Sequence, residues 1–172
     1  MTSTRIVITL FTKDRPGIVG EVSDLVLAHK GNWLESSLSR LCGLFTGIIH
    51  IEVPTDRHNA LIKALRGLSQ QDIEILVHNN HTGSEDSHEI NGLQIVVEAN
   101  DRPGIVQELA DALARENINI DSLDTEVESA AMAGHGIFRA HLFLAMPDDV
   151  SEDDLEQILE SVSDDVMVSF AE

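Results

Sequence analysis

The sequence contains the same six residues twice, and this repeat constrains the fold more than any other feature. Asp-Arg-Pro-Gly-Ile-Val stands at residues 14–19 and again at 101–106, 87 positions further along a chain of 172 residues. A length of 172 alone would suit one domain. A long identical repeat instead predicts two copies of one structural unit. We expect these copies to occupy residues 1–78 and 92–172.

The residues around each repeat change from strand-like to helix-like periodicity. Before it, apolar residues alternate with polar ones, as in a half-buried strand; they are Ile6, Ile8 and Leu10, then Leu93, Ile95 and Val97. After it, the apolar residues follow helical spacing: Ile18, Val22, Leu25 and Val26, then Ile105, Leu109, Ala112 and Leu113. We place Pro16 and Pro103 in the first helical turn. We expect Gly31 and Asn117 to end the helices in the left-handed conformation.

The rest of each half predicts two strands, a second helix and a last strand. The second helices carry matching apolar residues, and Ser151 with Asp154 resembles a capping box. Each half thus has the order βαββαβ, the ferredoxin-like α+β pattern with both helices on one face of an antiparallel sheet. Residues 79–91, "NNHTGSEDSHEIN", hold one strongly apolar residue and predict a flexible linker.

The sheet face opposite the helices is expected to be partly apolar in the first half. By alternation it carries Val7, Phe11, Leu44 and Ile48. Scattered apolar residues are normal on protein surfaces. A contiguous apolar patch instead marks a contact face, which here would make a homodimer. The sequence leaves both interpretations open.

The charge balance excludes some partners. Thirty Asp and Glu outnumber 11 Lys and Arg, for a formal net charge of -19. Binding to nucleic acid depends largely on cations that neutralise phosphates, so we expect no direct nucleic-acid or membrane binding. Cys42 is the only cysteine, no secretory signal is evident and no apolar run is long enough to span a membrane. These features predict a cytoplasmic location.

The repeated turn has the chemistry of a small-ligand site. It lies between a strand and a helix start, where free N–H groups and the helix dipole favour an anion such as a carboxylate. The glycine has no Cβ, so a ligand or a neighbouring backbone can approach closely. An Asn stands 18 residues beyond each Asp, at the start of the next strand. A helix start, an Asp and an Asn together suit a small zwitterion, although the same residues also make a good strand-to-helix turn without a ligand.

The two halves resemble the ACT domain, in the stretches "TKDRPGIVGEVSDLVLAHKGNWL" and "ANDRPGIVQELADALARENINI". The resemblance implies domains that pair side by side, with effectors held between the turn of one domain and the second strand of the other. The implied ligand-binding residues are Asp14, Gly17, Ile18, Asn32, Asp101, Gly104, Ile105 and Asn119. Trp33 departs from the smaller apolar residue that is usual at its position, so the two sites need not be equivalent.

Two such domains with nothing added most closely resemble the glycine cleavage system transcriptional repressor family. The resemblance implies a regulatory protein that senses an amino acid, glycine above all, and represses transcription through contact with a DNA-binding activator. A stand-alone ACT module that regulates a metabolic enzyme is the alternative. An enzyme is a third class, but no nucleophile, metal or cofactor signature supports it, and we expect no cofactor. The histidines and acidic residues near the linker lack the compact spacing of a metal site.

Overall fold

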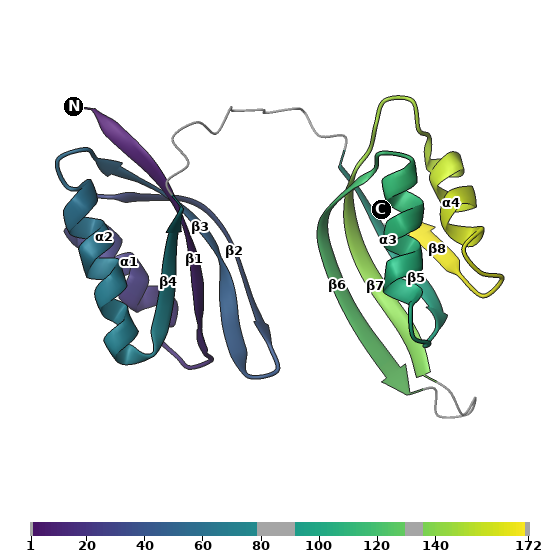
Figure 1. The fold of residues 1–172 in the computed structure, drawn as a ribbon, viewed down its shortest axis with the longest axis horizontal. Coiled ribbons are helices and arrows are strands. Elements are labelled where there is room, and N and C mark those ends of the chain that lie inside the picture. Colours follow the sequence, from purple (N-terminus) through teal and green to yellow (C-terminus); the bar gives the residue numbers. More distant parts are fainter. Residues whose placement is uncertain (1, 79–91, 130–135, 171–172) are drawn as a thin grey trace. The chain divides into compact units, whose positions relative to one another are not determined.

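The computed structural model describes residues 2–78, 92–129 and 136–170 (Figure 1). The chain divides into two compact units, Met1–Asp86 and Ser87–Glu172. The predicted linker lies outside the described residues.

The first unit has the predicted order βαββαβ. Its elements are β1 (Ser3–Lys13), α1 (Ile18–Ala28), β2 (Asn32–Leu41), β3 (Leu44–Pro54), α2 (His58–Gly67), a 3-10 helix η1 (Leu68–Gln71) and β4 (Ile73–His78). The four strands form an antiparallel sheet in the order β2-β3-β1-β4. This is the ferredoxin-like arrangement expected from the sequence.

The second unit repeats that arrangement. Its elements are β5 (Gly92–Asn100), α3 (Ile105–Arg115), β6 (Asn119–Ser129), β7 (Gly136–Ala145), α4 (Glu152–Glu160) and β8 (Met167–Phe170). The sheet order is β6-β7-β5-β8, again antiparallel. The predicted capping box is confirmed: the Ser151 hydroxyl accepts from the Asp154 N–H, and the Asp154 carboxylate accepts from the Ser151 N–H.

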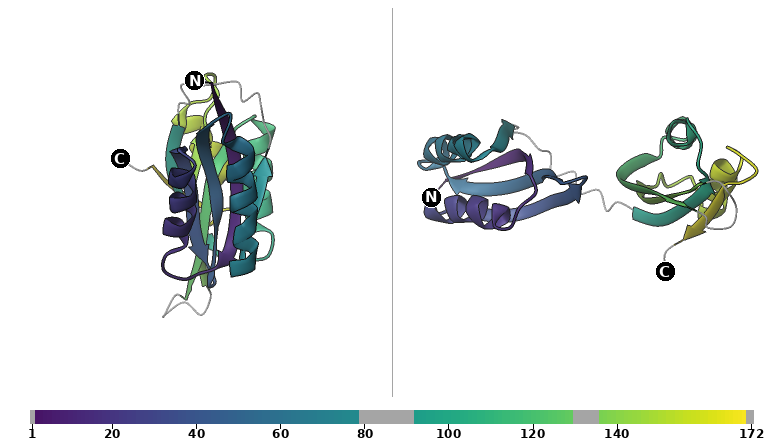
Figure 2. Two further views of the ribbon diagram at one scale, coloured as in Figure 1. Left: turned by 90° about the vertical axis from the view of Figure 1, so that its left-hand side faces the viewer. Right: turned by 90° about the horizontal axis from the view of Figure 1, so that it is seen from below.

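Both helices of each unit cover one face of its sheet (Figure 1), and Figure 2 (left) looks onto α1 and α2 of the first unit. The alternating residues predicted to face inward are buried: Ile6, Ile8 and Leu10 in β1, and Ile95 and Val97 in β5. They pack with the apolar faces of the helices into a separate core in each unit. Among the residues described for each unit, no helix of that unit covers the opposite face of its sheet.

The sequence predicted Pro16 and Pro103 in the first helical turn, but the structure places both prolines before the helix. The helices begin at Ile18 and Ile105, each after a glycine with φ of 95°. Proline followed by a glycine at positive φ is the pattern of a type II turn. The N–H of Ile105 donates to the Arg102 carbonyl at 3.4 Å, which closes this turn. The glycine is thus required by the turn itself.

The end of α1 also differs from the prediction. Lys30, not Gly31, adopts the left-handed conformation, with φ of 58°, whereas Asn117 does so in the second unit as expected. Gly31 is needed for a different reason: a Cβ there would lie 2.9 Å from Val26 Cγ1 and 3.3 Å from the Glu52 carbonyl oxygen. The sequence showed the glycine but not this close approach.

Candidate functional site

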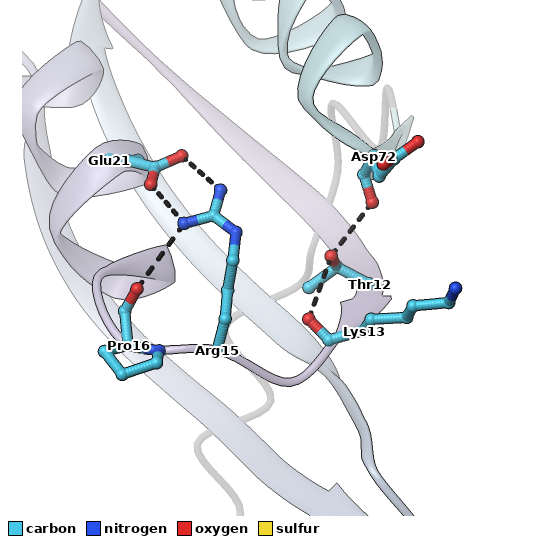
Figure 3. A network of polar contacts seen from close by, with 6 residues as sticks. All are labelled: Thr12, Lys13, Arg15, Pro16, Glu21 and Asp72. Carbon is cyan, nitrogen blue, oxygen red and sulfur yellow. Dashed lines mark hydrogen bonds and ion pairs between the residues drawn. The ribbon is translucent and has the colours of Figure 1, made fainter.

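An ion pair within the turn holds the start of α1 (Figure 3). Both guanidinium nitrogens of Arg15 donate to the carboxylate of Glu21, Nη2 at 2.8 Å, and Nη1 also reaches the Pro16 carbonyl at 3.4 Å. The hydrogen bonds from Arg15 lower the pKa of Glu21 below its ordinary value. The pair lies at the surface, so its direct effect on stability is small. Its effect is to orient the turn.

The second turn is built in the same way. Arg102 donates to both oxygens of Glu108, which lowers the pKa of that carboxyl. A Cβ on Gly104 would lie 3.8 Å from Glu108 Oε1, an ordinary contact. The turn is therefore open enough for a side chain, and only its positive φ demands glycine.

A third carboxylate, Asp165, adds negative charge near the second turn. It accepts from the Ser163 hydroxyl and, at 2.8 Å, from the backbone N–H of Asn100, the last residue of β5. These hydrogen bonds lower its pKa to about 2, so it is ionised at neutral pH. The pKa of Arg102 is raised first by its hydrogen bonds to Glu108, and the negative charge of Asp165 raises it further.

The two aspartates of the repeat have different surroundings. Both backbone N–H groups bind the adjacent β-hairpin: that of Asp14 donates to Gly43 at 2.9 Å, and that of Asp101 to Gly136 at 2.8 Å. The Asp14 carboxylate also accepts from Arg40 Nη1 at 3.3 Å. The equivalent of Arg40 in the second unit is Val127, which cannot make this ion pair. The Asp14 carboxylate is thus paired with Arg40 of the same unit, whereas the second unit has no arginine at the equivalent position.

A hollow of about 180 Å³ opens at the first turn, lined by Asp14, Arg15, Gly17, Ile18, Val19, Gly20 and Phe45. A cavity of roughly 150 Å³ is enough for a benzene-sized ligand, so a small amino acid would fit this one. The side chains of Ile18 and Ile105 are buried in the cores of their units. A ligand at the turn would therefore meet the backbone of the first helical turn and not these side chains; the N–H of Ile105 is itself already bonded to the Arg102 carbonyl.

The predicted asparagines do not join the turn of their own unit. Asn32 pairs with Glu52 at one end of the first sheet, whereas Asp14 contacts Gly43 at the other end. Asn119 likewise begins β6, at the end of its sheet opposite the second turn. Within one unit, the structure brings together the Asp, Gly and Ile positions but not the Asn.

Comparison with known proteins gives the family. ACT-domain models match residues 4–78 and 93–164. The chain belongs to the ACT-domain family. No sequence among the curated proteins matches it.

Two solved structures that resemble this chain match it over nearly its whole length. One is a protein of unknown function from Galdieria sulphuraria, with 23% identity, a TM-score of 0.83 and coverage of 99% of this chain and 100% of that one. The other is a proposed glycine cleavage system transcriptional repressor, with 20% identity, a TM-score of 0.73 and coverage of 100% and 99%. At these identities the likeness establishes the fold.

Sequence reasoning missed several residues of the ACT turns. The pairs Arg15–Glu21 and Arg102–Glu108 recur with the 87-residue period, so the repeat extends to D-R-P-G-I-V-x-E and held this signal. Arg40 had no such signal, because it comes from a distant hairpin and has no counterpart in the second ACT domain.

The described part of the chain gives no sign of a metal site or a membrane span. Among residues 2–78, 92–129 and 136–170, no three His, Cys, Asp or Glu side chains are placed to hold a metal ion. Within the same ranges, every helix is too short or too polar to cross a bilayer. His81 and His88, which the sequence raised as candidate ligands, lie outside these ranges.

Proposed function

We propose that the protein is an amino-acid-sensing regulator that binds its effector at the turns between β1 and α1 and between β5 and α3. The observation that supports this most directly is the hollow beside the first turn. Both the Asp14 carboxylate and the start of α1 line it. Helix N–H groups favour the carboxylate of an amino acid, and the Asp carboxylate favours its ammonium group. Glycine is the smallest ligand with both groups.

The effector site requires two ACT domains in this proposal. Asp14, Gly17 and Ile18 of one domain would face Asn119 of another, and Asp101, Gly104 and Ile105 would face Asn32. The separation of each Asn from the turn of its own domain supports this. An Asn amide both donates and accepts hydrogen bonds, so it suits either end of a zwitterion. The tandem repeat supplies two domains in one chain.

We infer that the regulator acts through protein contact on a DNA-binding transcriptional activator. The net charge of -19 argues against direct contact with DNA, because phosphates repel such a surface. A metabolic enzyme is the alternative partner. An effector that bridges two domains favours one arrangement of them, and linkage then requires effector and partner to change each other's affinity by the same factor.

The experiment is capture of partners by the tagged chain, with and without glycine, from cells that contain it. Glycine-dependent capture of a DNA-binding activator supports repression through protein contact. Capture of a metabolic enzyme instead supports the alternative, and turnover of amino or keto acids by the pure protein would contradict a purely regulatory role.

A further inference from the structure

The sheet face of the first ACT domain that lies opposite its helices is both apolar and exposed. Phe11 is 45% exposed, Ile48 53% and Leu76 66%, although all three lie within strands. Their register places them close together: Thr9 pairs with Ile48 on one side and with Leu76 on the other, two residues from Phe11. We call Leu76, Thr9 and Ile48 the central row. Large apolar patches on a soluble domain mark contact surfaces.

The second ACT domain differs on the same face. Arg139, two residues from the middle of β7, pairs there with Glu98, Glu126 and Glu128 at 2.6, 3.5 and 3.4 Å. The position that corresponds to Ile48 is His141. Phe143 and Met167 are 40% and 60% exposed on this face of the second domain, but they lie on either side of the charged and polar residues at its middle, so the continuous apolar row of the first domain is absent there.

We propose that this face binds the same face of a second copy of the chain, with a two-fold axis along the central row. Two copies of so acidic a chain repel each other, but this face carries two cations, Arg5 and Lys13, against three anions, Glu35, Glu52 and Glu74. It is close to neutral and is therefore a surface on which two copies can meet. This inference is independent of the effector site.

An isologous interface requires a face that complements itself. Rotation about the central row gives this except at Lys13, which comes over Arg5 of the other copy; Arg5 is paired with Glu52 at 3.8 Å. Rotation about the row places Ile48 on Ile48 and Leu76 on Leu76 of the other copy. Phe11 and Val7 lie two residues either side of Thr9, so each Phe11 comes over Val7 of the other copy. Glu74 pairs with Phe11, and His78 pairs with Val7, so each carboxylate meets an imidazole.

A depression on the same face suits the aromatic ring. It measures about 340 Å³ and is lined by Val7, Glu35, Ser36, Ser37, Ile48 and His50. The two-fold rotation brings Phe11 over Val7 of the other copy, which lies four residues away, roughly 13 Å along the strand. Each ring would therefore enter the depression of the other copy.

The size of the face predicts a weak dimer. Eleven residues of β1 and four strands give a face of roughly 35 by 19 Å, about 650 Å² per copy. The total of about 1,300 Å² is at the low end of specific interfaces, which span about 1,200–2,000 Å². We expect a dissociation constant in the micromolar range.

The test is sedimentation velocity of the full chain between about 1 and 200 µM. We expect a monomer–dimer equilibrium, and Ile48→Glu, which sets two carboxylates against each other across the axis, should weaken it more than about 100-fold. His141→Glu, at the same position of the second domain, should leave it unchanged. A monomer throughout, an unaffected Ile48→Glu variant, or equal loss with His141→Glu overturns the proposal.

A second variant guards against misfolding of Ile48→Glu. In a Cys42→Ser background, a short thiol-reactive bifunctional crosslinker should join two copies of Ile48→Cys, because residue 48 meets itself across sheets that pack about 10 Å apart. Leu27→Cys, on the exposed face of α1, should not be joined. If Ile48→Cys is crosslinked no more than Leu27→Cys, the two-fold axis is wrong and the proposal fails.

Discussion

Replacing two glycines of the first ACT domain by alanine should have opposite effects on stability. Gly17 has φ of 95°, and its Cβ would meet only Glu21 Oε1, at 3.7 Å. Space is available, so the cost of Gly17→Ala is that of the left-handed conformation, about 1–2 kcal/mol. Gly20 lies inside α1 with nothing within 4 Å of a Cβ. Gly20→Ala should therefore stabilise the domain by about 0.5–1 kcal/mol, through helix propensity.

The only tryptophan makes the measurement specific to this domain. Trp33 is half-buried at the edge of the first core, so its fluorescence reports unfolding of the first domain alone. With a urea slope of about 1 kcal/mol/M, Gly17→Ala should lower the midpoint by roughly 1–2 M and Gly20→Ala should raise it by roughly 0.5–1 M. Shifts of the same sign, or no shift for Gly17→Ala, would refute the type II turn as the reason for this glycine.

Three further predictions concern the hydrogen-bonded carboxylate of Asp165, the cap of α4 and the net charge of the chain. The folded pKa of Asp165, about 2, lies below its ordinary 3.8, so its stabilising effect is present above about pH 4 and is lost as the pH falls toward 2; denaturation midpoints of Asp165→Asn should fall less steeply with acid than those of wild type. Ser151→Ala removes the cap of α4 and should cost about 1 kcal/mol in chemical denaturation, whereas Ser23→Ala, which removes only a hydrogen bond to the Gly20 carbonyl within α1, should cost less. The pure protein should give no sequence-selective mobility shift with DNA at physiological salt, and a tight shift would contradict the inference from charge.

The sequence predicted the fold because its signals were local and occurred twice. Alternation of Ile6, Ile8 and Leu10 gave the inward face of β1, and the capping box at Ser151 gave the start of α4. The residues at which the helices end were harder to predict from the sequence. Whether Lys30 or Gly31 takes the left-handed conformation depends on how closely α1 approaches β3, which periodicity does not encode.

The candidate site was predictable only in part, for a similar reason. The repeat identified Asp14 and Gly17, and helical spacing identified the buried Ile18, but the ion pair from Arg40 comes from a segment distant in sequence. The β-bulge after Trp33, which recurs after Ile120, was also missed, since it inserts one residue without a glycine or proline to mark it. It changes which face the residues beyond it occupy.

The central claim is that the DRPG turns bind an amino acid with the help of an asparagine from a second ACT domain. Isothermal calorimetry of the full chain with glycine, and then with the other common amino acids, tests it most directly. Wild type should bind glycine saturably. Asn119→Ala should weaken binding roughly five-fold, through loss of about 1 kcal/mol of hydrogen bonding, and Asn59→Ala, on the exposed surface of α2, should not. If no amino acid binds, the turns are structural only. If a folded Asn119→Ala variant binds as wild type does, the asparagine takes no part in the site and the central claim is wrong.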